Sequence, residues 1–144
     1  EKKRIKVGSF LEGKILIVDD IPKNIQMAMN ILKNEGYKMF YAKSGQMVLD
    51  LVDEHSFDLI LLDIMMPDIS GFEVCIELKN NNKTKDIPII FLSGKNSSQD
   101  ISQAYESGGI DYVVKPFITI ELITKVNSYV RLKRLEDRFG ASYV

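Results

Sequence analysis

The sequence predicts an α/β domain in which five parallel strands form a doubly wound sheet with helices on both faces. Three short runs are apolar at every position, which is typical of strands that are covered on both sides. Segments of helical period separate the runs, and strands that alternate with helices through short connections form parallel sheets with right-handed crossovers. Five strands in this arrangement favour the flavodoxin-like strand order 2-1-3-4-5.

The first part of the chain contains two strand–helix units. Residues 14–18 form the first predicted strand and residues 37–42 the second. The helix between them has Pro22 in its first turn and Gly36 just past its end. Its apolar face has the spacing of one side of a helix and consists of Ile25, Ala28, Met29 and Leu32. The second helix follows a turn at residues 44–45, and its apolar face is Val48, Leu51 and Val52.

Three further strand–helix units complete the pattern. The strands are predicted at residues 59–62, 87–92 and 112–114. The third helix follows residues 70–71, the fourth ends near residues 108–109, and the fifth continues into residues 131–138. Their apolar faces are Phe72, Cys75 and Ile76; Ile101, Ala104 and Tyr105; and Ile123, Val126 and Val130.

Composition excludes several classes of protein. The chain has 144 residues, of which 45% are hydrophobic and 27% charged, as in an ordinary soluble domain. Nineteen basic and twenty acidic residues give no general basic field, so we expect no direct binding to nucleic acid or membrane. No apolar run reaches the roughly 18 residues of a membrane-spanning helix. The single cysteine, Cys75, excludes an internal disulfide, and we expect a cytoplasmic domain.

Polar side chains follow four of the predicted strands at the point where each strand ends. They are Asp19 and Asp20 after the first strand, Asp63 after the third, Ser93 after the fourth and Lys115 after the fifth. In doubly wound sheets, ligands bind outside the carboxyl ends of the strands. Alone, each residue has an ordinary explanation, since aspartate caps helices and lysine is mostly exposed. Their coincidence at one edge indicates a functional site.

Three neighbouring carboxylates repel one another unless a cation or protons compensate their charge. Mg²⁺ suits such a site because it binds one or two carboxylates, keeps several waters and accepts phosphate oxygens. The Lys115 ammonium could neutralise a phosphoryl oxygen, and the Ser93 hydroxyl could donate to another. A carboxylate in this setting is a candidate nucleophile that accepts a phosphoryl group.

The sequence around these residues resembles the receiver domain of two-component response regulators (CheY-like proteins). Four stretches carry the resemblance: residues 14–20, which end in Asp19-Asp20; 58–73, which contain Asp63 and Pro67; 87–94, which end in Ser93-Gly94; and 111–117, which contain Lys115-Pro116. Together they place the resemblance over about residues 13–130. It implies a phosphoacceptor that receives its phosphoryl group from a sensor histidine kinase or a phosphotransfer protein.

The resemblance also implies a role for each site residue. Asp63 corresponds to the phosphorylated aspartate. The Mg²⁺ ligands would be Asp19, Asp20, Asp63 and the backbone carbonyl of Met65. Ser93 and Tyr112 correspond to the switch hydroxyl and switch aromatic, and Lys115 to the lysine that contacts the phosphate. Phosphorylation would change the surface formed by the fourth helix, the fifth strand and the fifth helix.

Three further features of the family can be located in the chain. The Lys115-Pro116 bond corresponds to one that is cis in the family. Gly94 stands where alanine is usual, which should loosen the loop after the fourth strand. Met65 and Lys95 correspond to positions that tune the lifetime of the phosphoryl group.

An enzyme is the main alternative. A phosphatase of the haloacid-dehalogenase type would have a second aspartate two residues after Asp63, where this chain has Met65. A flavin or nucleotide binder would have a glycine-rich phosphate loop after the first strand, where Asp19 and Asp20 would repel phosphate. We therefore expect a regulatory domain whose only chemistry is self-phosphorylation from small phosphodonors and autodephosphorylation.

The chain divides into three segments, and the sequence does not identify the output domain to which the receiver domain is attached. They are an N-terminal lead-in (1–12), the receiver domain (13–130) and a helical C-terminal extension or linker (131–144). In the extension, Leu132, Leu135 and Phe139 have the spacing of a heptad seam. The extension is then either a helix that pairs with a second copy, giving a homodimer, or a plain linker. The chain could stand alone or belong to a larger regulator or a hybrid kinase.

Overall fold

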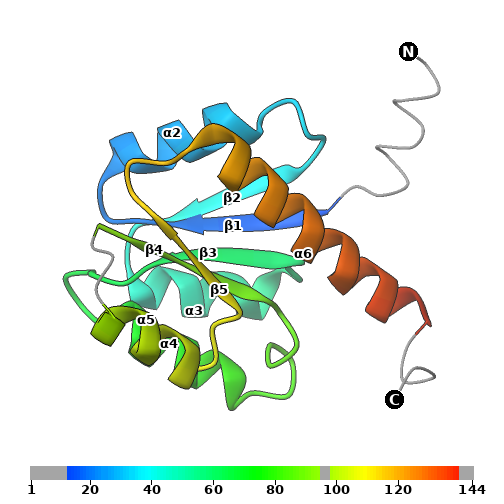
Figure 1. Cartoon of the computed structure of the whole chain (residues 1–144). Helices are drawn as coiled ribbons and strands as arrows, with labels where there is room; N and C mark the ends of the chain where they lie inside the picture. Colours follow the sequence, from blue (N-terminus) through cyan, green and yellow to red (C-terminus); the bar gives the residue numbers. More distant parts are fainter. Residues whose placement is uncertain (1–12, 95–97, 140–144) are drawn as a thin grey trace.

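A five-stranded parallel sheet lies between two layers of helices in the computed structural model of this chain (Figure 1). The structure describes residues 13–94 and 98–139. The lead-in 1–12, Lys95 and the last five residues of the extension lie outside the described residues. The strand order is β2-β1-β3-β4-β5, which confirms the predicted order.

The five strands agree closely with the apolar runs. They are β1 (Lys14–Val18), β2 (Lys38–Ala42), β3 (Leu59–Asp63), β4 (Ile89–Ser93) and β5 (Asp111–Val114). β4 begins two residues later than predicted, because Pro88 has no backbone N–H to donate to a neighbouring strand. β3 and β4 each extend one residue further than their apolar runs, to Asp63 and Ser93. Asp63 pairs with Leu92, and Ser93 pairs with Val114. Both candidate site residues therefore belong to the sheet.

The helices lie where the sequence predicts them. They are α2 (Pro22–Leu32), α3 (Gly45–Glu54), α4 (Gly71–Lys79), α5 (Ser98–Glu106) and α6 (Thr119–Phe139). Ser44 caps α3 by accepting from the Met47 N–H, and Ser70 caps α4 in a reciprocal pair with Glu73. Across the described ranges, none of these helices combines the length and apolarity needed to cross a membrane.

Two separate cores explain why the central strands are apolar at every position. Along β1, Ile15 and Ile17 pack into the core beneath α2 and α6, whereas Leu16 and Val18 pack into the core beneath α3, α4 and α5. Figure 1 shows the same division, with α2 and α6 above the sheet and the other three helices below it. Because both faces are buried, the strands do not alternate apolar with polar residues.

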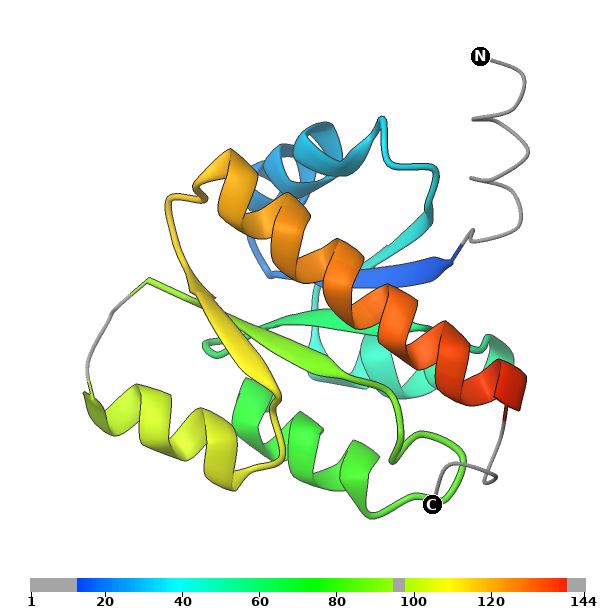
Figure 2. The same ribbon diagram turned by 45° about the vertical axis from the view of Figure 1, so that its right-hand side comes forward.

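The last helix, α6, is 21 residues long and continues past the sheet, as the sequence predicts (Figure 2). The side chains of Val126 and Val130 are buried where α6 packs against the sheet. Further on, the Arg134 guanidinium lies 3.3 Å from Asp58, whose carboxylate also accepts from the Lys14 backbone N–H. The second half of α6 is thereby held against the starts of β1 and β3.

Candidate functional site

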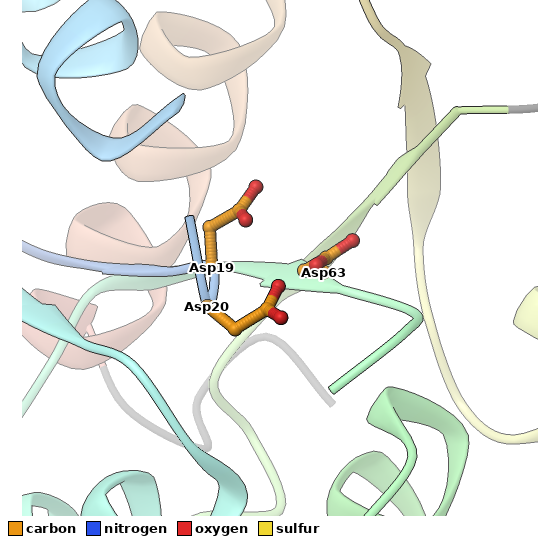
Figure 3. A group of neighbouring side chains, drawn as sticks. All are labelled: Asp19, Asp20 and Asp63. Atoms are coloured by element: carbon orange, nitrogen blue, oxygen red, sulfur yellow. The ribbon is translucent and has the colours of Figure 1, made fainter. Parts of the chain in front are cut away.

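Three aspartates meet at the carboxyl ends of β1 and β3, which are neighbours in the sheet (Figure 3). One carboxylate oxygen from each of Asp19, Asp20 and Asp63 lies within 4.8 Å of the others. Asp19 is fully buried and Asp63 is 4% exposed, whereas Asp20 is exposed. The structure therefore brings the predicted acidic residues together, and the cluster opens to solvent on the side of Asp20.

The acidic pair does not act as the cap of the helix that follows it. The N-cap of α2 is Ile21, and no side chain makes a capping hydrogen bond there. The Asp19 Oδ1 instead accepts from the Ile21 backbone N–H at 3.0 Å, which holds the carboxylate at the turn after β1. The capping explanation, which would account for either aspartate alone, is therefore excluded for α2.

Lys115 joins the ends of three strands. Its ammonium lies 3.1 Å from Asp19 Oδ2 and 3.2 Å from Asp63 Oδ1. Its backbone N–H donates to the Ser93 carbonyl at 2.7 Å, and the Lys115-Pro116 bond is cis, as the resemblance implies. Burial lowers the pKa of Lys115, but the neighbouring carboxylates outweigh burial, and the net pKa is raised. The lysine is therefore firmly protonated.

One ammonium does not neutralise this cluster. Burial, followed by repulsion from Asp19, raises the pKa of Asp63 from 3.8 to about 6 despite the opposing effect of Lys115. The cluster thus carries excess negative charge that a cation would compensate. Three carboxylates are hard oxygen donors of the kind that Mg²⁺ accepts, so the donor set fits this ion. Bound Mg²⁺ would supply positive charge to anionic oxygens entering from the open side.

Without divalent cations, we expect Asp63→Asn to raise the free energy of unfolding at pH 7 by about 2 to 3 kcal/mol. The folded protein holds the Asp63 proton more tightly than the unfolded chain, since the pKa rises from 3.8 to about 6. The contribution of this group to stability is therefore complete below pH 3.8 and is lost as the pH rises through about 6. Each pKa unit corresponds to about 1.4 kcal/mol.

Urea unfolding in a chelator between pH 4 and pH 8 measures this effect. The gain in stability of Asp63→Asn should shrink toward zero at the acid end of the series. Asp53→Asn removes an exposed carboxylate from α3 and serves as the control. A gain for Asp63→Asn at pH 7 no larger than that of Asp53→Asn would contradict the prediction.

The remaining predicted residues lie around the cluster. Ser93 ends β4 and is buried, next to the strand that carries Asp63. The Tyr112 ring, on β5, lies 6.3 Å from the Tyr105 ring of α5, and the Lys125 ammonium of α6 lies 5.3 Å from it. Met65 follows β3, and its side chain is 77% exposed. Tyr112 is therefore in contact with both helices of the predicted output surface.

Two residues near the site have roles that the sequence reasoning did not find. Gly71, at the start of α4, donates its N–H to the Ile64 carbonyl, and an added Cβ would lie 2.2 Å from the Asp63 carbonyl oxygen. Asp68 accepts from the N–H groups of Gly45 and Gln46 at the start of α3, and these bonds lower its pKa. Both contacts join segments across the fold, so neighbouring residues give no signal for them.

Comparison with known proteins agrees with this geometry. The model of the response regulator receiver domain family matches residues 15–127. The chain is 41% identical over 123 residues to a probable cyclic di-GMP phosphodiesterase of Vibrio cholerae, covering 85% of this chain and 28% of that protein. It is 35% identical over 127 residues to the response regulator PleD of Caulobacter vibrioides, covering 88% of this chain and 28% of PleD.

A solved structure shows the same fold over nearly its whole length. The chemotaxis response regulator CheY4 of Vibrio cholerae matches with a TM-score of 0.77 and 28% identity, covering 82% of this chain and 98% of that one. This chain spans only 28% of the length of the two curated relatives named above. The family match, the strand order and the acidic cluster agree, and the chain belongs to the family of response-regulator receiver domains.

Proposed function

We propose that Asp63 is the phosphorylated residue of this receiver domain and that Asp19, Asp20, Asp63 and the backbone carbonyl of Met65 hold Mg²⁺. Receiver domains are regulatory phosphoacceptors of two-component systems, phosphorylated by histidine kinases or phosphotransfer proteins. The observation that carries the assignment is the position of Asp63. It is a buried carboxylate at the end of a central strand, and it lies 3.2 Å from the Lys115 ammonium, which also pairs with Asp19.

The proposed step is a transfer from phosphohistidine to Asp63. A carboxylate oxygen of Asp63 attacks phosphorus, an O–P bond forms, and the P–N bond to the imidazole breaks. The imidazole leaves with the bonding electrons and takes up a proton. Lys115 holds Oδ1 at 3.2 Å, and no described residue donates to Oδ2, which suits Oδ2 as the attacking atom. Hydrolysis of the resulting acyl phosphate resets the domain.

Lys115 and Ser93 would carry the change away from the site. Phosphorylation adds about −1.5 to −2 charge and three acceptor oxygens. The Lys115 ammonium and the Ser93 hydroxyl then gain a new anionic partner, and a backbone hydrogen bond already links these residues. The Tyr112 ring can move behind Ser93, which alters its contacts with Tyr105 and Lys125. The α5–β5–α6 surface would have two conformations, and phosphorylation would favour one of them.

We expect Ser93→Ala and Tyr112→Ala to leave phosphorylation of Asp63 largely intact but to uncouple it from the α5–β5–α6 surface. The reason is that each change removes a contact behind the phosphate and leaves the acceptor carboxylate in place. Lys115→Ala should uncouple the surface in the same way. Amide NMR shifts on addition of beryllofluoride, a phosphate mimic, provide the measurement.

Ser56→Ala, at an exposed serine before β3, is the matched control and should respond as the unchanged protein does. In the Ser93→Ala protein, shifts across α5, β5 and α6 should fall to a small fraction of those in the control. Equal shifts in Ser93→Ala and Ser56→Ala would count against the coupling.

Phosphorylation from a small phosphodonor tests the proposed function. Incubation with acetyl phosphate and Mg²⁺ should add the mass of one phosphoryl group to the intact chain. The modification should be labile to base and hydroxylamine, as an acyl phosphate is. It should be absent in a chelator and in Asp63→Asn. Catalytic turnover of a phosphorylated small molecule, far beyond one equivalent, would instead favour the phosphatase alternative.

The chain would act within a longer protein. Residues 13–130 form the receiver unit of this proposal, with 1–12 leading into it and 131–144 connecting it to an output. The greater length of the curated relatives supports a larger regulator or a hybrid kinase as the context. The near balance of charge supports a cytoplasmic segment that binds neither nucleic acid nor membrane directly.

A further inference from the structure

The loop between β3 and α4, residues 64–70, carries the backbone carbonyl that we propose as a metal ligand. The base of this loop is closed by a hydrogen bond from the Gly71 N–H to the Ile64 carbonyl, at 2.7 Å. Within the part of the chain that the structure describes, no hydrogen bond holds the backbone of Met65 or Met66. The position of the Met65 carbonyl therefore depends on contacts made further along the loop.

Asp68, three residues after Met65, attaches this loop to a different helix. Its Oδ1 accepts from the Gly45 N–H and its Oδ2 from the Gln46 N–H, each at 3.0 Å. These are the first two residues of α3, where free N–H groups and the helix dipole favour a negative charge. The two hydrogen bonds lower the pKa of Asp68, so the carboxylate stays ionised at neutral pH. They form the Asp68–α3 contact, which joins residues 23 and 22 positions apart.

The start of α3 is also anchored beside the acidic cluster. The Asp19 backbone N–H donates to the carbonyl of Ala42, the last residue of β2, at 3.1 Å. Only a short turn separates Ala42 from Gly45, the first residue of α3. Gly45 packs closely against the loop itself, since an added Cβ would lie 2.9 Å from the Ile69 side chain. Asp68 therefore joins the segment that holds the acidic pair to the loop that carries the proposed carbonyl ligand.

We propose that Asp68 is a positioning residue for Mg²⁺, because the Asp68–α3 contact holds the loop in the conformation that presents the Met65 carbonyl to the ion. This inference rests on the proposed function, in which the three aspartates and this carbonyl bind the metal. With the contact in place, the ion meets a loop that is already ordered. Without it, the loop must be ordered when the ion binds, and the lost conformational entropy reduces the affinity. Once bound, the ion itself holds the carbonyl.

The affinity of Asp68→Ala for Mg²⁺, measured without a phosphodonor, tests the inference. The full chain is titrated with Mg²⁺, and the amide NMR shifts of residues around the acidic cluster give the Kd. The Kd should rise by about tenfold, as it does when a group that orients a metal ligand is removed. The rate of phosphorylation from acetyl phosphate should fall at low Mg²⁺ and return at saturating Mg²⁺ to that of the unchanged protein.

Two control variants separate the Asp68–α3 contact from the other effects of Asp68→Ala. Glu73→Gln removes one negative charge at the start of α4, just after the same loop, and glutamine can still accept from the Ser70 N–H. Ser44→Ala removes the local cap of α3, the hydrogen bond that its hydroxyl accepts from the Met47 N–H. Both variants should keep the Kd of the unchanged protein, because neither releases the loop from α3.

The titrations also distinguish a failure of this inference from a failure of the proposed metal site. An unchanged Kd in Asp68→Ala would overturn the positioning role, and so would an equal rise of the Kd in Glu73→Gln or Ser44→Ala. A phosphorylation rate of Asp68→Ala that stays low at saturating Mg²⁺ would overturn it as well. Asp20→Ala should lose Mg²⁺ binding in the same titration. Unchanged affinity in Asp20→Ala would overturn the proposed metal site itself, whatever the result for Asp68→Ala.

Discussion

Replacing Asp20 with alanine is expected to slow phosphorylation from a small phosphodonor by about a hundredfold and to remove its dependence on Mg²⁺. Asp20 is the exposed member of the acidic cluster and lies on its solvent side, where a hydrated ion would enter. In its proposed role as a metal ligand, its loss would weaken the compensation of charge around the incoming phosphoryl oxygens. A hundredfold change in rate corresponds to about 2.7 kcal/mol, within the range of such electrostatic stabilisation.

Initial rates of phosphorylation across a Mg²⁺ titration provide the measurement. Asp53→Ala is the control, since it removes one exposed carboxylate of α3 that is not a member of the cluster and should behave as the unchanged protein does. The metal-free fold of Asp20→Ala should be no less stable than the original, because repulsion within the cluster falls. Normal phosphorylation of Asp20→Ala in a chelator would refute the metal role.

Gly71→Ala is expected to destabilise the domain by about 2 to 4 kcal/mol and to impair phosphorylation of the molecules that fold. An added Cβ would lie 2.2 Å from the Asp63 carbonyl oxygen and 3.0 Å from the Ile64 Cα, and both are backbone atoms that no rotamer change can move away. The start of α4 or the end of β3 must shift, and forced overpacking of this kind costs about 1–3 kcal/mol or more. Either shift moves the Asp63 carboxylate, which is the proposed acceptor.

Gly94→Ala is the matched comparison, because an added Cβ there meets nothing within 4 Å. This second variant should keep full stability or gain a few tenths of a kcal/mol through a less flexible unfolded chain. Urea unfolding and the phosphorylation rate should separate the two variants. Equal stability of Gly71→Ala and Gly94→Ala would show that the contact between Gly71 and Asp63 does not constrain the fold.

The sheet could be predicted from sequence because burial on both faces requires apolar residues throughout each central strand. Ile15 and Leu16 point into different cores, yet neither can be polar. The site could be located for a similar reason, since parallel strands bring their carboxyl ends to one edge whatever the intervening loops do. Asp19 and Asp63 lie 44 residues apart and still converge there.

The contacts that hold the site in place could not be read from the sequence in the same way. The bridge from Lys115 to both Asp19 and Asp63 depends on side-chain geometry at the ends of three strands. The approach of Gly71 to the Asp63 carbonyl depends on how the loop after β3 folds back, and a glycine beside Ser70 indicates only a turn. The ion pair between Arg134 and Asp58 joins residues 76 positions apart, and the sequence around either residue does not predict it.

Mapping the phosphorylated residue tests the central claim most directly. The chain is phosphorylated from acetyl phosphate with Mg²⁺, the acyl phosphate is trapped by borohydride reduction, and the peptides are sequenced by mass spectrometry. The Asp63 peptide should carry the trapped modification, and the peptides with Asp19, Asp20 and His55 should not. A modification that maps to Asp19, Asp20 or His55, or that persists in Asp63→Asn, would contradict the assignment of Asp63 as the acceptor.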